Sequence, residues 1–142
     1  MNNQLHFSSA DSKWSTPQEL FDKLNSQFHF TIDLAASAEN TKCPIFFSEE
    51  QDSLAQDWDY HVGWLNPPYS RQLGKWLKKA YETGLAGGTV VMLLPARTDV
   101  KWFHQYVMKA DKVIFLKGRL KFGDATSGAP FPSMIVIFRP SI

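Results

Sequence analysis

The chain has 142 residues, of which 44% are hydrophobic and 20% charged, and its formal net charge is +1. This length and balance predict one globular domain spanning residues 1–142 and exclude an intrinsically disordered chain. The near-neutral charge excludes a uniformly basic surface, so a nucleic-acid surface would have to be a local patch. The single cysteine, Cys43, excludes an internal disulfide and a cysteine-based zinc site, and we interpret it as a small buried side chain. No segment resembles a signal peptide or a membrane span, so we expect a soluble cytoplasmic protein.

The N-terminal region is expected to be a loose polar arm followed by a helix. Residues 1–13 are polar and weakly patterned, which predicts the arm. Thr16 is a suitable N-cap because its hydroxyl can accept a hydrogen bond from a free backbone N–H, and Pro17 suits the first helical position. The apolar spacing that follows predicts a helix ending near Asn25 or Ser26.

Two predicted strands flank an irregular stretch of the chain. Residues 28–34 have a strand-like pattern that ends in Asp33 and is followed by small residues. Residues 39–57 show no periodic pattern. Residues 60–65 predict a second strand, which runs directly into the sequence Asn-Pro-Pro-Tyr at 66–69.

The second half alternates in the same way. Helices are predicted over residues 71–83 and 99–109, and strands over 112–116 and 133–138. Residues 89–94 are the most apolar run, which is typical of a central strand buried on both faces. The loop between the last two strands contains glycines and basic residues, and loops of this length are usually functional or mobile.

This alternation predicts an α/β fold with a mostly parallel sheet and the last two strands antiparallel at its edge. In open sheets of this kind, ligands bind beyond the carboxyl ends of the strands. Asp33, Asn66 and the turn at 95–97 all fall at such ends. The sequence therefore predicts a functional site at this edge of the sheet.

The segment Asn66-Pro67-Pro68-Tyr69 suits recognition of an amino group. A residue before proline is restricted to extended geometry, and each proline has a fixed φ and no backbone N–H. The turn therefore presents rigid acceptors, the Asn66 amide oxygen and a backbone carbonyl, which match the hydrogens of an exocyclic amino group. Tyr69 offers a flat face on which a planar ring can stack. A merely rigid loop is the alternative interpretation.

A set of motifs in a fixed order extends this observation. The set comprises Trp14-Ser15-Thr16-Pro17, Asp33-Leu34-Ala35-Ala36-Ser37, Asp52-Ser53-Leu54 with Trp58, Asn66-Pro67-Pro68-Tyr69-Ser70, Leu94-Pro95-Ala96-Arg97-Thr98 and Gly118-Arg119-Leu120-Lys121-Phe122. Together these motifs resemble the phage-type DNA N6-adenine methyltransferase family, a compact group common in phages and prophages. The resemblance implies a Rossmann-like fold abbreviated between the first strand and the catalytic motif, and a phage- or prophage-encoded protein acting in the bacterial cytoplasm.

The resemblance also implies a mechanism. The target adenine is flipped out of the duplex, and its amino hydrogens bond to the Asn66 side-chain oxygen and the Pro67 carbonyl. The amino nitrogen then attacks the sulfonium methyl group of S-adenosylmethionine. Pro68 completes the rigid turn, Tyr69 stacks on the base, and no metal is required.

For the cofactor, the resemblance implies contacts from several segments. Asp33 stands where the glycine-rich loop of wider methyltransferases begins, and Asp52 would accept from the adenosyl amino group. The full predicted set is Trp14, Thr16, Pro17, Asp33, Ala35, Asn40, Asp52, Ser53, Leu54 and Asn66. Readings without a cofactor stay open: Asp33 could cap a turn, Asp52 could be solvated, and Thr16 could be only a helix cap. Trp58 is better interpreted as a core residue.

Double-stranded DNA is the expected partner. The predicted contacts are Arg97, Arg119, Lys121 and Phe122, which lie at the functional edge or in the long loop. The chain leaves no room for a separate target-recognition domain, so recognition would be short or relaxed, or a homodimer would complete the DNA surface. Two alternative functions stay open, a methyltransferase acting on RNA adenine or a protein glutamine amide, and a non-catalytic cofactor- or DNA-binding relative.

Overall fold

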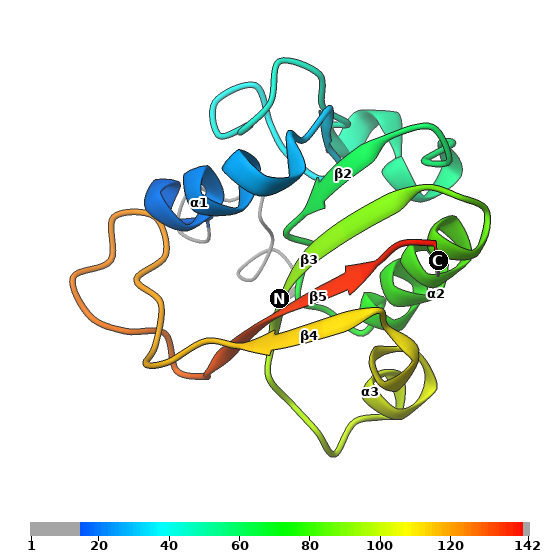
Figure 1. Cartoon of the computed structure of the whole chain (residues 1–142). Coiled ribbons are helices and arrows are strands. Elements are labelled where there is room, and N and C mark those ends of the chain that lie inside the picture. The colour runs from blue at the N-terminus through cyan, green and yellow to red at the C-terminus, as the bar shows by residue number, and fades with distance from the viewer. Residues whose placement is uncertain (1–14, 141–142) are drawn as a thin grey trace.

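The fold is an α/β arrangement around one five-stranded mixed sheet, seen in a computed structural model that describes residues 15–140 (Figure 1). The strands are β1 (Ile32–Asp33), β2 (Val62–Leu65), β3 (Thr89–Pro95), β4 (Lys112–Phe115) and β5 (Ser133–Phe138). The helices are α1 (Gln18–Phe28), α2 (Leu73–Leu85) and α3 (Lys101–Gln105), with short 3₁₀ turns η3 (Glu49–Gln51), η4 (Ser53–Ala55) and η5 (Val107–Lys109). Trp14 and the predicted arm at 1–13 lie outside the described residues.

The strand order in the sheet is β1-β2-β3-β5-β4. Strands β1, β2 and β3 are parallel, which confirms the prediction for the middle of the sheet. Strand β5 is antiparallel to both β3 and β4, so it lies between them and β4 forms the edge. The last two strands therefore form the antiparallel edge of the sheet, as predicted, with the final strand β5 inside and β4 outermost. Every residue of β5 is buried, whereas β4 is partly exposed, and a strand without an exposed position belongs in the sheet interior.

Side chains of β3 divide the core into two layers. Val90, Met92 and Leu94 pack in the cluster that contains Leu77 and Ala80 of α2. The alternate residues Val91 and Leu93 pack in a second cluster with α1 and the long loop at 116–132. Successive side chains of a strand point to opposite faces, and for this reason one apolar strand serves both layers. Figure 1 shows α2 and α3 on one side of the sheet and α1 on the other.

The first strand is much shorter than predicted. Helix α1 continues to Phe28, and His29 then adopts a left-handed conformation with φ 55° that ends the helix. The Asn25 side chain accepts a hydrogen bond from Phe30 N at 2.8 Å, which fixes the chain in the turn that follows. Phe28 to Phe30, which the apolar pattern assigned to a strand, therefore belong to the end of α1 and the turn that follows it.

The expected single helix at 99–109 is also divided. Helix α3 ends at Gln105, and Tyr106 has φ −126° and ψ −47°, which separates it from η5. The Tyr106 ring lies 5.9 Å from the ring of Tyr81 on α2. Packing against α2 accompanies the break. Within residues 15–140, no helix has the length and apolar character needed to span a bilayer.

Candidate active site

Polar residues lie at the carboxyl ends of the three parallel strands, along one edge of the sheet. Asp33 ends β1, Asn66 follows β2, and Arg97 follows β3 by one turn. A small cavity lies at this edge, lined by Ser15, Thr16, Asp33, Ala35, Asn40, Lys42, Trp64 and Asn66. The cavity measures about 10 Å³, which is room for roughly one water molecule. At this size it cannot enclose a nucleoside.

Asp33 is the acidic residue among those that line the cavity. Its side chain is buried, and it accepts hydrogen bonds from Ala35 N at 3.3 Å and Lys42 N at 3.0 Å. Burial raises the pKa of Asp33 to about 6, although both hydrogen bonds and the Lys42 charge oppose the shift. The bond to Ala35 N shows that the turn-capping role of Asp33 is real, and a ligand contact is compatible with it. A buried carboxylate in this setting attracts a cationic group.

The Asn66 amide is buried and held in one position. Its side-chain nitrogen Nδ2 donates to Thr16 Oγ1 at 3.2 Å, and both residues are more than nine-tenths buried. Pro67 is buried as well, and Pro68 is partly exposed. The two prolines fix the backbone directly after the amide because neither can rotate about φ.

Tyr69 is held by its hydroxyl and by a ring contact. The hydroxyl donates to the Leu93 carbonyl at 3.2 Å, and the ring meets Phe131 edge to face with 5.6 Å between centroids. Burial raises the pKa of the Tyr69 hydroxyl far above its ordinary range, so the side chain stays neutral. The ring is partly exposed and is anchored to the second core layer.

Thr16 and Pro17 do not begin α1 in the predicted way. Pro17 is itself the N-cap, with φ −56° and ψ 128°, and the helix begins at Gln18. Thr16 caps nothing: its hydroxyl instead meets Asn66 across the cavity. Pro17 is not among the residues that line the cavity.

Half of the predicted cofactor residues come together in this cavity. They are Thr16, Asp33, Ala35, Asn40 and Asn66. Asn40 closes the loop after β1, because its side-chain oxygen accepts from Ser37 N at 2.8 Å. Sequence reasoning did not select Ser15, Lys42 or Trp64, which also line the cavity. The position of Lys42 depends on the loop after β1, and no periodic pattern indicates it.

The segment Asp52–Leu54 does not line this cavity. Asp52 is exposed and left-handed, with φ 51°, at the junction of η3 and η4. Ser53 is buried, and its hydroxyl has no hydrogen-bond partner in the described structure. Its backbone carbonyl accepts from Trp58 Nε1 at 3.0 Å, and Trp58 is 1% exposed, which confirms the interpretation of Trp58 as a core residue. Leu54 packs against the same core layer.

The predicted DNA contacts divide into exposed and buried residues. Arg97, Arg119 and Lys121 are exposed. Phe122 is 2% exposed and packs against Phe131 with 6.1 Å between ring centroids. In this arrangement Phe122 is a core residue whose ring is not presented to a nucleic acid.

The long loop at 116–132 is held in place by hydrogen bonds as well as by the packing of Phe122. The neighbouring Gly123 N donates to Ser15 O at 3.0 Å, and Arg119 Nη1 donates to Ala129 O at 3.3 Å. The loop at 116–132 is therefore tied to the segment that precedes α1 and covers one face of the sheet.

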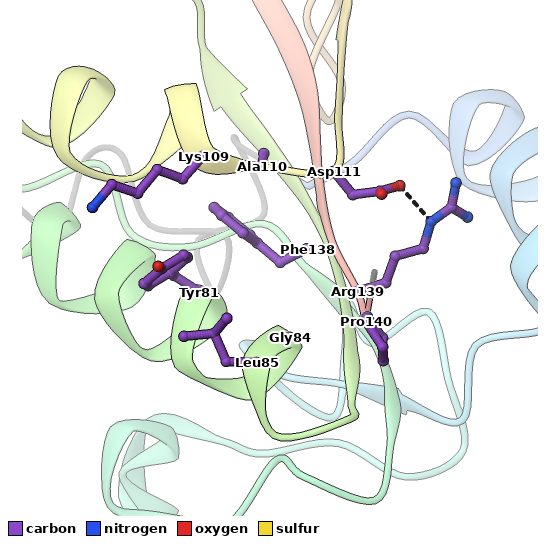
Figure 2. A pocket seen from close by; sticks show the side chains of 9 residues that line it. All are labelled: Tyr81, Gly84, Leu85, Lys109, Ala110, Asp111, Phe138, Arg139 and Pro140. Carbon is purple, nitrogen blue, oxygen red and sulfur yellow. Dashed lines mark hydrogen bonds and ion pairs between the residues drawn. The ribbon is translucent and has the colours of Figure 1, made fainter. Parts of the chain in front are cut away.

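A larger cleft of about 510 Å³ lies at the other end of the sheet (Figure 2). Its lining residues are Tyr81, Gly84, Leu85, Lys109, Ala110, Asp111, Phe138, Arg139 and Pro140. Phe138 pairs with Val90 at the start of β3, so this cleft is opposite the edge that carries Asn66. The Arg139 guanidinium and the Asp111 carboxylate pair at 2.6 Å there. The cleft contains no residue of the predicted site.

The described residues contain no group of three or more His, Cys, Asp and Glu side chains arranged to hold a metal ion. Cys43 is buried, as predicted, and burial together with the neighbouring Asp33 charge raises the pKa of its thiol to about 11. The cavity thus contains an acid and a buried amide, and the rigid proline turn follows the amide directly in the chain.

The structure is thus an α/β domain with a small polar cavity at the carboxyl ends of its parallel strands, which is where open sheets of this kind bind their ligands. The chain belongs to the DNA N-6-adenine-methyltransferase (Dam) family, which matches residues 4–142. This match confirms the family predicted from the motifs.

Curated relatives agree with this assignment. The chain is 34% identical over 135 residues to the DNA N-6-adenine-methyltransferase of Haemophilus phage HP1, covering 89% of this chain and 78% of that protein. It is 38% identical over 110 residues to the DNA N-6-adenine-methyltransferase of Escherichia phage T1, covering 75% of this chain and 45% of that protein. A putative methyltransferase of Escherichia coli K12, YfdM, is 34% identical over 64 residues, covering 40% of this chain and 70% of that protein.

Proposed function

We propose that this protein is a DNA adenine methyltransferase that moves a methyl group from S-adenosylmethionine to the exocyclic amino group of adenine in double-stranded DNA. Membership of the DNA N-6-adenine-methyltransferase family supports the reaction and the DNA substrate. The observation that carries the proposal is the buried Asn66 amide, which is tied to Thr16 and followed by two prolines at the carboxyl end of β2. This arrangement supports an amino-group acceptor site.

The topology is compatible with a compact Rossmann-like methyltransferase fold. Three parallel strands are followed by an antiparallel strand inserted beside the edge strand. Between β1 and β2 the chain contains only two short 3₁₀ turns and one isolated bridge, Asp33 to Phe46. We interpret this region as the abbreviated part of the fold.

Within the cavity, Asp33 suits the amino acid end of the cofactor. That end carries an ammonium group, and the buried Asp33 carboxylate is the complementary charge in the cavity. The remaining predicted cofactor residues, Asp52 to Leu54 above all, would contact parts of the cofactor that the cavity cannot enclose. The buried, unpartnered Ser53 hydroxyl is the observation that supports this segment. When bound, S-adenosylmethionine supplies an electrophilic methyl group.

The proline turn then prepares the amino group of the base. Asn66 Oδ1 and the Pro67 carbonyl accept its two hydrogens, which turns the nitrogen lone pair away from the ring and makes it available. Because the turn is rigid, these acceptors need no rearrangement during the reaction, and positioned acceptors of this type account for much of the rate gain in enzymes. Tyr69 provides a stacking face for a base that has left the duplex.

The exposed cations Arg97, Arg119 and Lys121 are the proposed phosphate contacts. Phosphate contacts fix the position of a protein on DNA, while sequence is read at the bases. Completion of the DNA surface by a homodimer is also a proposal, and the mass of the complex on a short duplex tests it.

The test is methyl transfer from labelled S-adenosylmethionine to three acceptors offered in parallel: unmethylated duplex DNA, an RNA of matching sequence and a glutamine-bearing protein extract. Label recovered as N6-methyladenine from DNA supports the proposal. Label found mainly in RNA or protein would assign a different acceptor, and absence of both transfer and cofactor binding would indicate a non-catalytic relative.

A further inference from the structure

The side chain of Thr16 occupies an unexpected place for a residue just before a helix. Its hydroxyl oxygen accepts the hydrogen bond from Asn66 Nδ2 at 3.2 Å, across 50 residues of sequence. Both side chains are buried, with Thr16 6% and Asn66 3% exposed. The contact is therefore largely removed from bulk water, and it borders the small cavity that both residues line.

The backbone on both sides of Thr16 is anchored independently. Ser15 O accepts from Gly123 N at 3.0 Å, which ties the segment to the long loop. Pro17 O accepts from Phe21 N at 3.2 Å, which ties it to α1. The branched side chain of threonine has few allowed rotamers, so a fixed backbone also fixes the hydroxyl.

The two ends of the Asn66 amide have opposite hydrogen-bonding character. Nδ2 is a donor and Oδ1 is an acceptor, and a rotation of the amide by half a turn exchanges them. An adenine amino group has hydrogens to donate, so only the orientation with Oδ1 toward the base is productive. In the structure Thr16 Oγ1 accepts from Nδ2, which is the productive orientation. A hydroxyl could also donate to Oδ1 of the rotated amide, so the contribution of Thr16 is to satisfy the buried N–H of the productive orientation. With valine at position 16, the productive orientation would turn a buried N–H toward an apolar side chain.

We infer that Thr16 is a positioning residue, which holds the Asn66 amide with its oxygen toward the amino group of the target base. The inference rests on the proposed methyltransferase function. It differs from the role that the family resemblance implies for Thr16, which is contact with the cofactor. The two roles predict different losses when the hydroxyl is removed.

The test compares Thr16→Val, which removes the hydroxyl at nearly constant shape, with Thr16→Ser, which keeps it. We expect Thr16→Val to lower kcat for DNA methylation roughly tenfold to a hundredfold, the effect of one buried hydrogen bond. Affinity for S-adenosylhomocysteine, measured by calorimetry, should stay within about threefold of the unmodified protein. Thr16→Ser should recover kcat to within about fivefold.

A matched control is Thr83→Val. Thr83 is also a buried threonine, and its hydroxyl donates to Lys79 O at 2.8 Å within α2, away from the site. Its substitution should change thermal stability and leave kcat unchanged. If Thr16→Val does not fold, as judged by circular dichroism, Thr16→Ala replaces it in the comparison with Thr16→Ser.

Two results would overturn the inference while leaving the proposed function intact. One is an unchanged kcat in Thr16→Val. The other is a loss of S-adenosylhomocysteine affinity as large as the loss of kcat/KM, which would assign Thr16 to the cofactor. An unmodified protein that binds S-adenosylhomocysteine and methylates no adenine would instead overturn the proposed function, and the inference with it.

Discussion

The Asp33 carboxylate accepts a hydrogen bond from the backbone N–H of Lys42, with 3.0 Å between Oδ2 and N, at the carboxyl end of β1. This contact closes the loop after the strand and places an acid in the cavity that also contains Asn66. Burial nevertheless raises the pKa of Asp33 to about 6, because the loss of hydration outweighs the two backbone donors. Asp33 is therefore a group that titrates just below neutral pH, and two predictions depend on it.

The stability contributed by Asp33 should fall as the pH rises. Its pKa is raised from 3.8 to about 6 in the folded protein, so the protonated form is favoured by folding. The contribution is complete below about pH 4 and is lost through about pH 6, with a total on the order of 3 kcal/mol. Urea unfolding of the protein and of Asp33→Asn from pH 4 to 7 measures it. A constant difference in the free energy of unfolding between the two proteins would contradict the prediction.

Binding of the cofactor product should follow the opposite trend. If the Asp33 carboxylate attracts the ammonium group of S-adenosylhomocysteine, the affinity should increase as the pH rises through about 6 and the acid ionises. Calorimetric titrations between pH 5 and 7.5 test this. The Asp33→Asn variant should bind more weakly at pH 7 and show little dependence on pH. An equal pH dependence in both proteins would remove Asp33 from the cofactor site.

The two parts of Tyr69 should separate in mutants. Tyr69→Phe removes the hydroxyl that donates to Leu93 O and should cost roughly 1 kcal/mol of stability, with most activity kept. Tyr69→Ala also removes the ring, and we expect it to raise the KM for DNA and lower kcat. Denaturant unfolding and steady-state kinetics on the same preparations measure both effects. Full activity in Tyr69→Ala would show that the ring does not receive the base.

Lys121 should contribute to DNA binding through charge alone. Its side chain is exposed in the long loop, so Lys121→Ala should leave stability unchanged and weaken binding to all duplex sequences alike. The slope of log affinity against log salt should fall by about one unit for one lost phosphate contact. Lys23→Ala, which removes an exposed lysine of α1, is the matched control. Equal slopes for Lys121→Ala and the unmodified protein would exclude the contact.

The elements that the sequence predicted best are those whose burial is complete. Strand β5 occupies the predicted residues, and β3 extends the predicted run by only Pro95. A short continuous apolar run bounded by turn residues is typical of a buried strand, so these two strands could be predicted from the sequence. The insertion of β5 between β3 and β4 depends on pairing between distant segments, which local patterns do not encode. The same limit applies to α1, where Asn25 and His29 extend the helix into the predicted strand.

At the site, the motifs located Asp33 and Asn66 correctly at neighbouring strand ends. The local helix-start pattern, by contrast, predicted a capping role for Thr16, because N-caps are recognised from adjacent residues, whereas the partner of its hydroxyl is 50 positions away. Phe122 was expected to face DNA because it lies among basic residues. Its burial against Phe131 depends on how the loop folds back over the sheet.

The central claim is that the amide after β2 prepares an adenine amino group for methylation. The most direct measurement is transfer of labelled methyl from S-adenosylmethionine to unmethylated duplex DNA, with Asn66→Ala assayed beside the unmodified protein. We predict label on adenine N6 with the unmodified protein, and a loss of at least a hundredfold in Asn66→Ala. Circular dichroism and thermal unfolding of the variant serve as the control for its fold. Undiminished transfer by a folded Asn66→Ala variant would contradict the claim.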